Sequence, residues 1–263
     1  MFKIKQSQKL YAALIILAFF LIFLSSIINL YEKRHKIVNF IKFKTTPKEL
    51  QKKPWPQRDL ALDIINNGGY ILFFRHAERE KWIDVQKYDS LETLEGLKAE
   101  NEYFSKAVCL SDRGLVQGRA MGQLIKKIKL PYHIVVTSPS CRARQTAELA
   151  FGGYDSVRQI FMHYGVYYED KNEMAKQVKN EILKIPFKEK SNIIISAHNG
   201  VVRTTEIFDR IDKKNFDFGN IDRKFMNEGG FIVMKNENGK LVFVDLFYSF
   251  HKFYRNIYER PKD

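Results

Sequence analysis

The chain has 263 residues, of which 45% are apolar, and its formal net charge is +14. Residues 1–59 carry 12 Lys and Arg against 3 Asp and Glu, which leaves 32 against 27 in the other 204 residues. Because most of the positive excess lies in the N-terminal part, the composition argues against a nucleic-acid-binding domain and favours one folded domain with an attachment.

The attachment is the segment Leu10–Tyr31, which contains no charged residue. Its length exceeds the roughly 20 residues that a helix needs to cross a bilayer, and this predicts a transmembrane anchor after a short basic tail, residues 1–31 in all. A cleavable signal peptide would have a shorter apolar region ending in small residues, which Ser25-Ser26 matches poorly. A buried helix of a soluble domain would have little to pack against here. Lysines on both sides leave the orientation open.

Residues 32–59 are rich in lysine and contain Pro47, Pro54 and Pro56. Proline breaks helices and favours extended segments, so this stretch is predicted to be a linker. Its positive charge either attracts anionic lipid headgroups or is simply solvated. The folded domain is therefore expected at 60–263.

A helix is expected over Arg58–Asn66, ending before Gly68-Gly69. The apolar run Tyr70–Phe74 that follows is typical of a central parallel strand. The charged residues 75–79 come directly after it, at the strand end where open α/β sheets bind ligands. Residues at about 80–110 lack a clear period and are predicted to be an insertion that covers the site.

Strand and helix patterns then alternate along the chain. The expected elements are a helix from the N-cap Ser111 to Ile128, a strand at Ile134–Thr137, a helix up to Ala150, a helix at Glu173–Ile185, a strand at Ile193–Ser196, a helix from Val201, and a closing hairpin of Gly230–Met234 and Leu241–Tyr248 joined by residues 236–239. This order predicts a three-layer α/β/α sandwich with a mostly parallel central sheet, preceded by one transmembrane helix.

Three polar clusters follow three of the apolar strands: Arg75-His76 with Arg79, Ser138–Arg142, and His198-Asn199-Gly200. We expect one crevice to collect them. Two histidines and at least three arginines suit a dianionic phosphoryl group held by guanidinium contacts. A histidine in such a pocket can attack phosphorus through a ring nitrogen, which splits hydrolysis into formation and breakdown of a phosphohistidine.

These residues resemble the histidine phosphatase superfamily, also called phosphoglycerate mutase-like, whose signature after the first strand is R-H-G. Here the signature is Arg75-His76-Ala77. Residues 138–147, SPSCRARQTA, resemble the S-P-x-x-R-A-x-Q-T-A helix start of the family, and residues 196–200, SAHNG, resemble its second histidine motif. Residues 110–114, LSDRG, resemble its usual helix entry, so the resemblance extends from Gly69 to about Phe247.

The resemblance implies His76 as the catalytic nucleophile and Arg75, Arg142 and His198 as phosphoryl ligands. Arg79 stands where the acid phosphatase branch, with the motif R-H-G-x-R, has a further phosphate-binding arginine. No cofactor and no metal are implied.

Two positions depart from the family pattern. Ala77 replaces the usual glycine, and Asn199 stands where the acid phosphatase branch has the aspartate that protonates the leaving group. In the mutase-like branch a glutamate after the S-P-x-x-R motif is this acid, which makes Glu169 the candidate. Asp170 is its substitute and Glu78, two residues after His76, is a rival.

Other reactive residue types are given structural interpretations. Cys109 and Cys141 can pair if the domain lies outside the cytoplasm, but two isolated thiols are more often buried or free, and their spacing does not suggest zinc. Arg144 is expected on a helix surface. The histidines outside the clusters, His133, His163 and His251, are expected to be structural or exposed. The tyrosines Tyr164, Tyr167 and Tyr168 suit core packing as well as substrate stacking.

The leading hypothesis is a membrane-anchored phosphomonoesterase. A mutase-like phosphotransferase and an inactive, membrane-tethered phosphoryl-binding module are the alternatives. Residues 68–79 look similar to the same stretch of lipopolysaccharide core heptose phosphate phosphatases, which work outside the cytoplasm. That resemblance implies a small-molecule or glycan phosphomonoester as substrate and a catalytic domain on the extracytoplasmic face of a bacterial inner membrane, with the membrane as partner through the N-terminal helix.

Overall fold

The computed structural model describes residues 56–81, 85, 87–89, 108–162, 170–202, 205–212 and 226–258. All of them lie in the second of the two units into which the chain divides, Trp55–Asp263. None of the helices formed by these residues has the length and apolar character that crossing a membrane requires. The predicted anchor at 10–31, residues 32–55 of the predicted linker and most of the predicted insertion at 80–110 lie outside the described residues.

The described strands form a mixed seven-stranded sheet in the order β3-β2-β4-β1-β6-β7-β5. The strands are β1 (Ile71–Arg75), β2 (Tyr132–Thr137), β3 (Ser156–Val157), β4 (Asn192–Ala197), β5 (Arg210–Ile211), β6 (Phe231–Glu237) and β7 (Lys240–Phe247). β4 lies between β1 and β2 and pairs with both in parallel. The carboxyl ends of these three strands therefore meet at one edge, as the sequence predicts.

The antiparallel part of the sheet is the predicted hairpin. β6 pairs with β1 and with β7, and Glu237 faces Lys240 at its end. Asn238 and Gly239 form the turn with φ angles of 54° and 82°. Two successive left-handed residues are what a two-residue hairpin turn needs, so the connection is shorter than the predicted residues 236–239.

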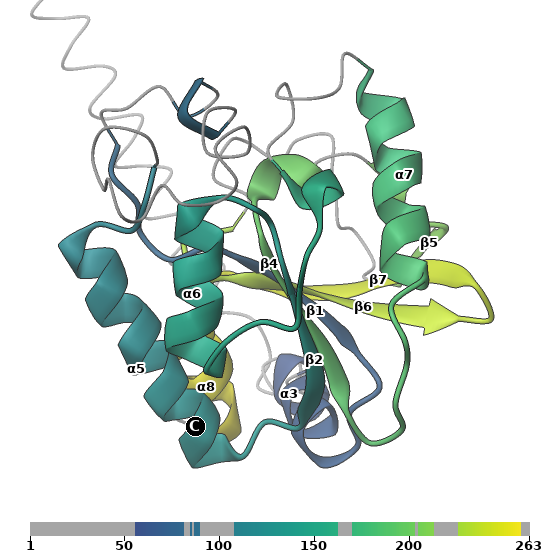
Figure 1. The fold of residues 1–263 in the computed structure, drawn as a ribbon. Coiled ribbons are helices and arrows are strands. Elements are labelled where there is room, and N and C mark those ends of the chain that lie inside the picture. Colours follow the sequence, from purple (N-terminus) through teal and green to yellow (C-terminus); the bar gives the residue numbers. More distant parts are fainter. Residues whose placement is uncertain are drawn as a thin grey trace, which may run out of the picture. The chain divides into compact units, whose positions relative to one another are not determined.

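Helices cover both faces of the sheet, which confirms the three layers (Figure 1). Alternate residues of β1 point to opposite faces: Ile71 and Phe73 join one core cluster, and Leu72 and Phe74 join the other. The first cluster contains the helix α7 (Lys171–Leu183). The second contains apolar residues of α3 (Pro56–Asn66), α5 (Asp112–Ile128), α6 (Cys141–Phe151) and α8 (Phe250–Tyr258).

Both predicted helix starts at the site edge are capped. The hydroxyl of Ser111 accepts from the backbone N–H of Gly114 at 3.1 Å, and the hydroxyl of Ser140 accepts from that of Ala143 at 3.4 Å. Gly114 also lets α5 approach the loop after β1, because a Cβ built there would lie 1.8 Å from the carbonyl oxygen of Glu78. The S-D-R-G motif thus fixes α5 beside the residues that follow His76.

Several elements differ from the prediction. The helix expected from Val201 is replaced by short 3-10 helices, η3 (Asn199–Val202) and η4 (Thr205–Ile207), since glycine and β-branched residues disfavour an α-helix here. α3 begins two residues earlier than predicted, at Pro56, a residue type that the first turn tolerates. α7 lies two residues earlier than predicted, after its cap Asp170. The prediction missed α8, β3, β5 and η2 (Gln159–Phe161).

Candidate active site

His76 lies directly after β1 and is buried, and its backbone N–H continues the parallel ladder to the carbonyl of Ala197 at 3.0 Å. Its ring Nδ1 lies 2.7 Å from the carbonyl oxygen of Ala77. Because a carbonyl only accepts hydrogen bonds, Nδ1 must carry the proton, and the lone pair of the neutral ring is then on Nε2. The backbone thus selects the tautomer that a nucleophilic Nε2 requires.

Ala77 fits the position of the usual glycine without strain. It is buried, its φ lies outside the left-handed region, and its N–H donates to the Thr146 hydroxyl at 2.9 Å. A methyl group is therefore accommodated where the family has none, and the loop that carries His76 is tied to α6.

Burial and positive neighbours keep the ring of His76 neutral. Burial is the largest cause that lowers its pKa, and the charges of Arg142, Arg75 and, least of the three, Arg79 lower it further, whereas the hydrogen bond with the Ala77 carbonyl raises it. The pKa of His76 lies well below the ordinary value of 6.5. At neutral pH the imidazole is therefore uncharged, and its Nε2 is able to act as a nucleophile.

We expect this lowered pKa to extend activity into mildly acidic solution. The neutral ring is lost only as pH falls through the lowered pKa, so the His76-dependent acid limb of the single-turnover rate should lie below pH 6.5. Arg79→Gln removes one of the charges that depress this pKa and should move the limb to higher pH. A wild-type limb at or above 6.5 that Arg79→Gln leaves in place would contradict the expectation.

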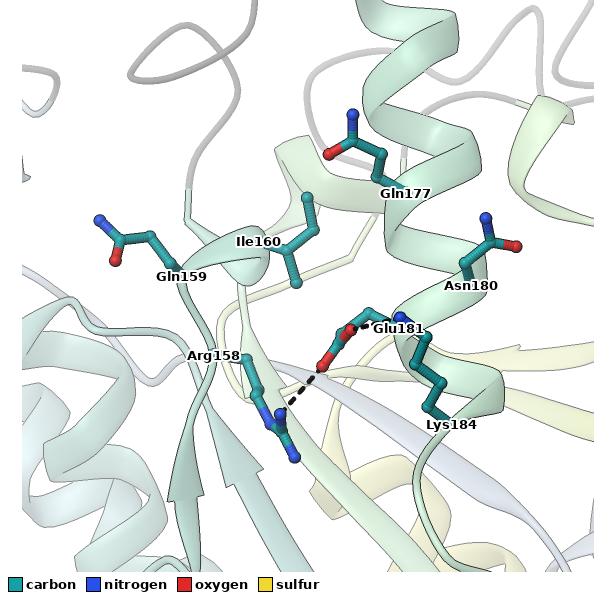
Figure 2. A pocket seen from close by; sticks show the side chains of 7 residues that line it. All are labelled: Arg158, Gln159, Ile160, Gln177, Asn180, Glu181 and Lys184. Carbon is teal, nitrogen blue, oxygen red and sulfur yellow. Dashed lines mark ion pairs between the residues drawn. The ribbon is translucent and has the colours of Figure 1, made fainter.

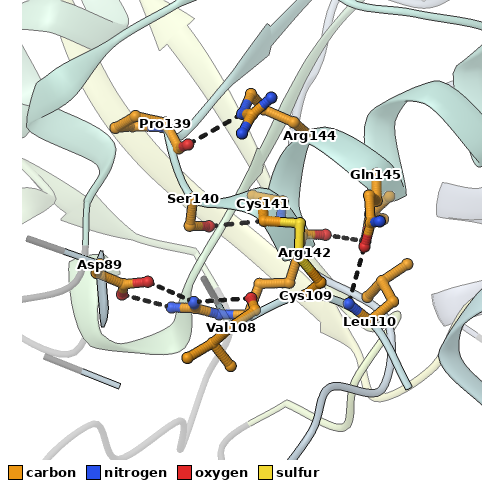
Figure 3. The surroundings of a disulfide bond; sticks show 12 residues. Asp89, Val108, Cys109, Leu110, Pro139, Ser140, Cys141, Arg142, Arg144 and Gln145 are labelled. Carbon is orange, nitrogen blue, oxygen red and sulfur yellow. Dashed lines mark hydrogen bonds and ion pairs between the residues drawn. A yellow bond between two sulfur atoms is a disulfide. The ribbon is translucent and has the colours of Figure 1, made fainter. Parts of the chain in front are cut away.

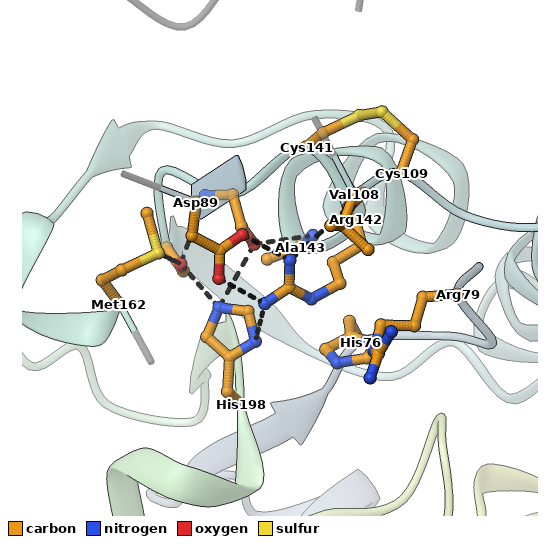
Figure 4. Close-up of polar contacts among 12 residues, drawn as sticks. His76, Arg79, Asp89, Val108, Cys109, Cys141, Arg142, Ala143, Met162 and His198 are labelled. Carbon is orange, nitrogen blue, oxygen red and sulfur yellow. Dashed lines mark hydrogen bonds and ion pairs between the residues drawn. A yellow bond between two sulfur atoms is a disulfide. The ribbon is translucent and has the colours of Figure 1, made fainter. Parts of the chain in front are cut away.

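Arg142 and His198 meet beside His76, as the sequence predicts (Figure 4). The Nη2 of Arg142 lies 3.2 Å from Nδ1 of His198, and the two histidine rings are 5.3 Å apart between centroids. Guanidinium groups only donate, so Nδ1 of His198 accepts and its Nε2 carries the proton. That Nε2 lies 2.9 Å from the Ser138 hydroxyl and 3.2 Å from the Ser140 hydroxyl.

The sequence reasoning missed the main partner of Arg142. Asp89 is fully buried, and its two carboxylate oxygens lie 2.6 and 2.8 Å from Nη1 and Nη2 of Arg142. A buried carboxylate in a segment without periodicity gives no signal in the sequence. Only its contact with a motif arginine reveals it.

The two remaining predicted arginines, Arg75 and Arg79, are held by other contacts. Nη1 of Arg75 donates to the Met226 carbonyl at 2.5 Å, and its Nη2 forms an ion pair with Glu228 at 3.2 Å. Arg79 is half-buried, and Nη1 donates to the carbonyl of Glu80 at 2.5 Å. Burial and the charges of Arg142 and Arg75 lower the pKa of Arg79, whereas Glu228 opposes this effect. Each of the predicted phosphoryl-binding arginines is therefore close to the others.

The central part of the sequence matches a known protein family. Residues 71–161 match the sequence model of the histidine phosphatase superfamily, branch 1. The resemblance to this superfamily is confirmed. The matched range contains Arg75, His76, Arg79 and Arg142, whereas His198 lies beyond it and reaches the site through β4. No protein of curated function matches the sequence.

Solved structures with a similar fold include three with low sequence identity. A functionally characterised open reading frame product of Mycobacterium tuberculosis is 19% identical over 69% of this chain and 98% of its own, with a TM-score of 0.45. The protein histidine phosphatase SixA, solved with tungstate, is 14% identical over 70% and 98%, with a TM-score of 0.44. A phosphoserine phosphatase of Entamoeba histolytica, solved with 3-phosphoglyceric acid, is 13% identical over 68% and 96%, with a TM-score of 0.45.

The general acid of the histidine phosphatase motif stays a prediction. Glu169 lies outside the described residues. Asp170 is exposed, and its carboxylate caps α7 by accepting from the N–H of Asn172 at 2.7 Å. Glu78 lies 3.4 Å from Nη2 of Arg113 and 3.5 Å from the Ser111 hydroxyl, and it lines an open hollow together with Arg75. Of these two described carboxylates, Glu78 is thus the one that lies beside a predicted phosphoryl-binding arginine.

Asn199, where the acid phosphatase branch has an aspartate, is buried with its amide directed at the backbone. Its Nδ2 donates to the carbonyl of Met226 at 3.2 Å, and among the described residues its Oδ1 has no hydrogen-bond partner. An amide N–H is too weak an acid to protonate a leaving group, so Asn199 is not the general acid.

Cys109 and Cys141 form a disulfide next to Arg142 (Figure 3). Their Cα atoms are 4.9 Å apart, and the bond joins the end of the predicted insertion to the first residue of α6. The prediction for Arg144 was wrong: it is buried, and Nε donates to the carbonyl of Pro139 at 3.0 Å. The start of α6 is therefore fixed by the disulfide at Cys141 and by the hydrogen bond between Arg144 and Pro139.

Replacing both cysteines by alanine should lower the free energy of unfolding by about 2–4 kcal/mol, because the disulfide closes a loop of 32 residues in the unfolded chain. Urea denaturation of the full chain in detergent measures the change. Dithiothreitol should destabilise the wild type to a similar extent and leave the double variant unaffected. A wild type whose denaturation midpoint does not respond to the reductant would disprove the prediction.

The histidines and tyrosines outside the motifs either lie away from the site or are not among the described residues. Nε2 of His133 contacts the carbonyl of Pro186 at 2.9 Å, and His251 is exposed. His163 and the tyrosines at 164, 167 and 168 are outside the described residues. A separate hollow between η2 and α7 contains the ion pair of Arg158 and Glu181 but none of the motif residues (Figure 2). The part of the chain that the structure describes contains no group of three or more potential metal ligands.

Proposed function

We propose that this protein is a membrane-anchored phosphomonoesterase that acts through a covalent phosphohistidine on His76. The observation that carries the proposal is the buried, neutral imidazole of His76, whose Nδ1–H is held by the Ala77 carbonyl and whose Nε2 remains available beside Arg142. This arrangement presents a nitrogen nucleophile to a group whose negative charge the arginines stabilise.

In the first step Nε2 of His76 attacks phosphorus, and the bond between phosphorus and the ester oxygen breaks. The leaving oxygen takes a proton from the general acid, for which Glu169, Asp170 and Glu78 are the candidates. Arg75, Arg79 and Arg142, with His198, stabilise charge on the phosphoryl oxygens. In the second step water attacks the phosphohistidine, the acid residue takes up the proton of the water, and phosphate leaves as His76 is regenerated.

We further propose that the catalytic domain lies on the extracytoplasmic face of a bacterial inner membrane and acts on envelope glycan phosphates. The Cys109–Cys141 disulfide supports this location, because disulfides persist in oxidising compartments. Residues 10–31 would be the anchor. Protease treatment of intact spheroplasts should remove the domain, and its protection would refute the location.

Rapid-quench labelling with a 32P-labelled phosphodonor tests the reaction. We expect an acid-labile, base-stable label on the wild type and none on His76→Ala. A wild type that binds phosphate but never becomes labelled would be a phosphoryl-binding module instead. A labelled enzyme that passes phosphate to a second phosphorylated metabolite and not to water would be a mutase-like phosphotransferase. A screen of sugar, lipid and protein phosphates with the same variant as control then identifies the substrate class.

A further inference from the structure

Asp89 is a carboxylate without a role in the reaction described above. It is fully buried in the described piece 87–89 of the predicted insertion, and its oxygens occupy both Nη atoms of Arg142 at 2.6 and 2.8 Å. Both partners are withdrawn from solvent, with 1% and 0% of their side chains exposed. Removing two charges from water costs free energy, so a buried ion pair beside the site needs a physical explanation.

The ion pair with Asp89 does not engage all the hydrogen-bond donors of Arg142. A guanidinium has five N–H donors, two on each Nη and one on Nε. Besides Asp89, Nη1 faces the carbonyl of Val108 at 3.5 Å and Nη2 faces Nδ1 of His198 at 3.2 Å. The Nε of Arg142 is buried and, among the described residues, has no hydrogen-bond partner.

Because Asp89 contacts both Nη atoms of Arg142, the Nε lies on the side of the guanidinium away from Asp89. Figure 4 shows Asp89 and His76 on opposite sides of the Arg142 guanidinium. The charge of Arg142 is also among the causes that lower the pKa of His76, which requires the two groups to be near each other. The Nη fork, the edge that carboxylates and phosphates usually share, is already filled by a carboxylate. A phosphoryl group beside His76 therefore meets the Nε edge.

We propose that Asp89 is a positioning residue, which holds Arg142 by its Nη fork so that the Nε–H is donated to the phosphoryl group on its way to His76. This inference rests on the proposed phosphohistidine reaction. The opposite interpretation is that Asp89 competes with phosphate for the fork and must leave when substrate binds. The two interpretations predict opposite kinetic effects when the carboxylate is removed.

Asp89→Asn, which keeps the size of the side chain, is the variant that separates them. Loss of orientation should lower kcat for p-nitrophenyl phosphate about 10- to 100-fold without raising KM, since misplacement of a transition-state donor affects the chemical step. A wild-type kcat with a lower KM would show a competitor and overturn the proposal. Glu181→Gln removes the partner of Arg158 outside the site and should leave both constants unchanged.

A second measurement does not depend on turnover. In 15N NMR spectra of the full chain in detergent, the Nε–H signal of Arg142 is the arginine signal that Arg142→Lys removes. Inorganic phosphate should shift this signal in the wild type, and the shift should be lost in Asp89→Asn. A wild-type signal that phosphate does not move would overturn the proposal. If the wild type shows this shift but forms no phosphohistidine, the proposed reaction fails while the role of Asp89 in orienting Arg142 stands.

Discussion

Replacing His76 with asparagine should lower kcat for phosphomonoester hydrolysis by at least about 10⁴-fold, because the group that forms the covalent intermediate is lost. The amide N–H of asparagine can still donate to the carbonyl of Ala77, which the ring Nδ1–H contacts at 2.7 Å. The ring of His76 is neutral at pH 7, so its replacement by a neutral side chain leaves the charge of the pocket unchanged. Steady-state assays and rapid-quench labelling on the same preparation measure the effect.

The matched control is His133→Asn, a histidine whose Nε2 contacts the carbonyl of Pro186 away from the motif residues. It should retain wild-type kcat. The phosphohistidine reaction is ruled out if His76→Asn hydrolyses substrate within about tenfold of the wild-type rate.

Replacing Arg142 with methionine should have the largest effect on stability. The substitution leaves the carboxylate of Asp89 buried without its cation, and removing one partner of a buried pair costs about 3–5 kcal/mol of unfolding free energy. It should also lower kcat/KM about 10²- to 10³-fold, because a donor to the phosphoryl oxygens is lost. Urea denaturation and steady-state kinetics of the full chain in detergent measure the two effects separately.

Two further variants show whether the buried pair is the cause. Arg142→Met combined with Asp89→Leu replaces both charges by apolar groups and should recover most of the stability while activity stays low. Arg158→Met removes an arginine from an ion pair in which 45% of its own side chain is exposed, so it should change stability by less than about 1 kcal/mol. Equal losses in Arg158→Met and Arg142→Met would contradict the assignment.

Local patterns predicted most of the central fold. The continuous apolar runs became β1 and β4, the predicted cap Ser111 became the N-cap of α5, and the two chain segments before and after Asn238-Gly239 became a hairpin. Each of these signals depends on nearest neighbours in the chain. α8 was missed because its aromatic residues do not favour a helix by themselves, and the helix is stabilised when Phe250 and Phe253 pack into the core.

Some residues of the site were predictable from sequence motifs, and others became visible only in the structure. Arg75, His76, Arg142 and His198 stand in motifs at strand ends, so sequence order and the parallel topology were enough to predict that they meet. Asp89 and Glu228 stand in no such pattern, and the Thr146 hydroxyl lies in the helix-start motif but was not predicted to contact the residue after His76. Their parts in the site depend on which buried charge or backbone group they face.

The sequence by itself determined the three-layer α/β architecture and the cluster of histidines and arginines at one edge of the sheet. Only the tertiary structure decided the proton position on His76, the disulfide beside Arg142, and the pairing of Arg142 with Asp89. The physical reason is that periodicity and strand ends are local properties of the chain. Tautomers and buried ion pairs are instead set by groups far apart in sequence, which compete for a few hydrogen bonds where water is excluded.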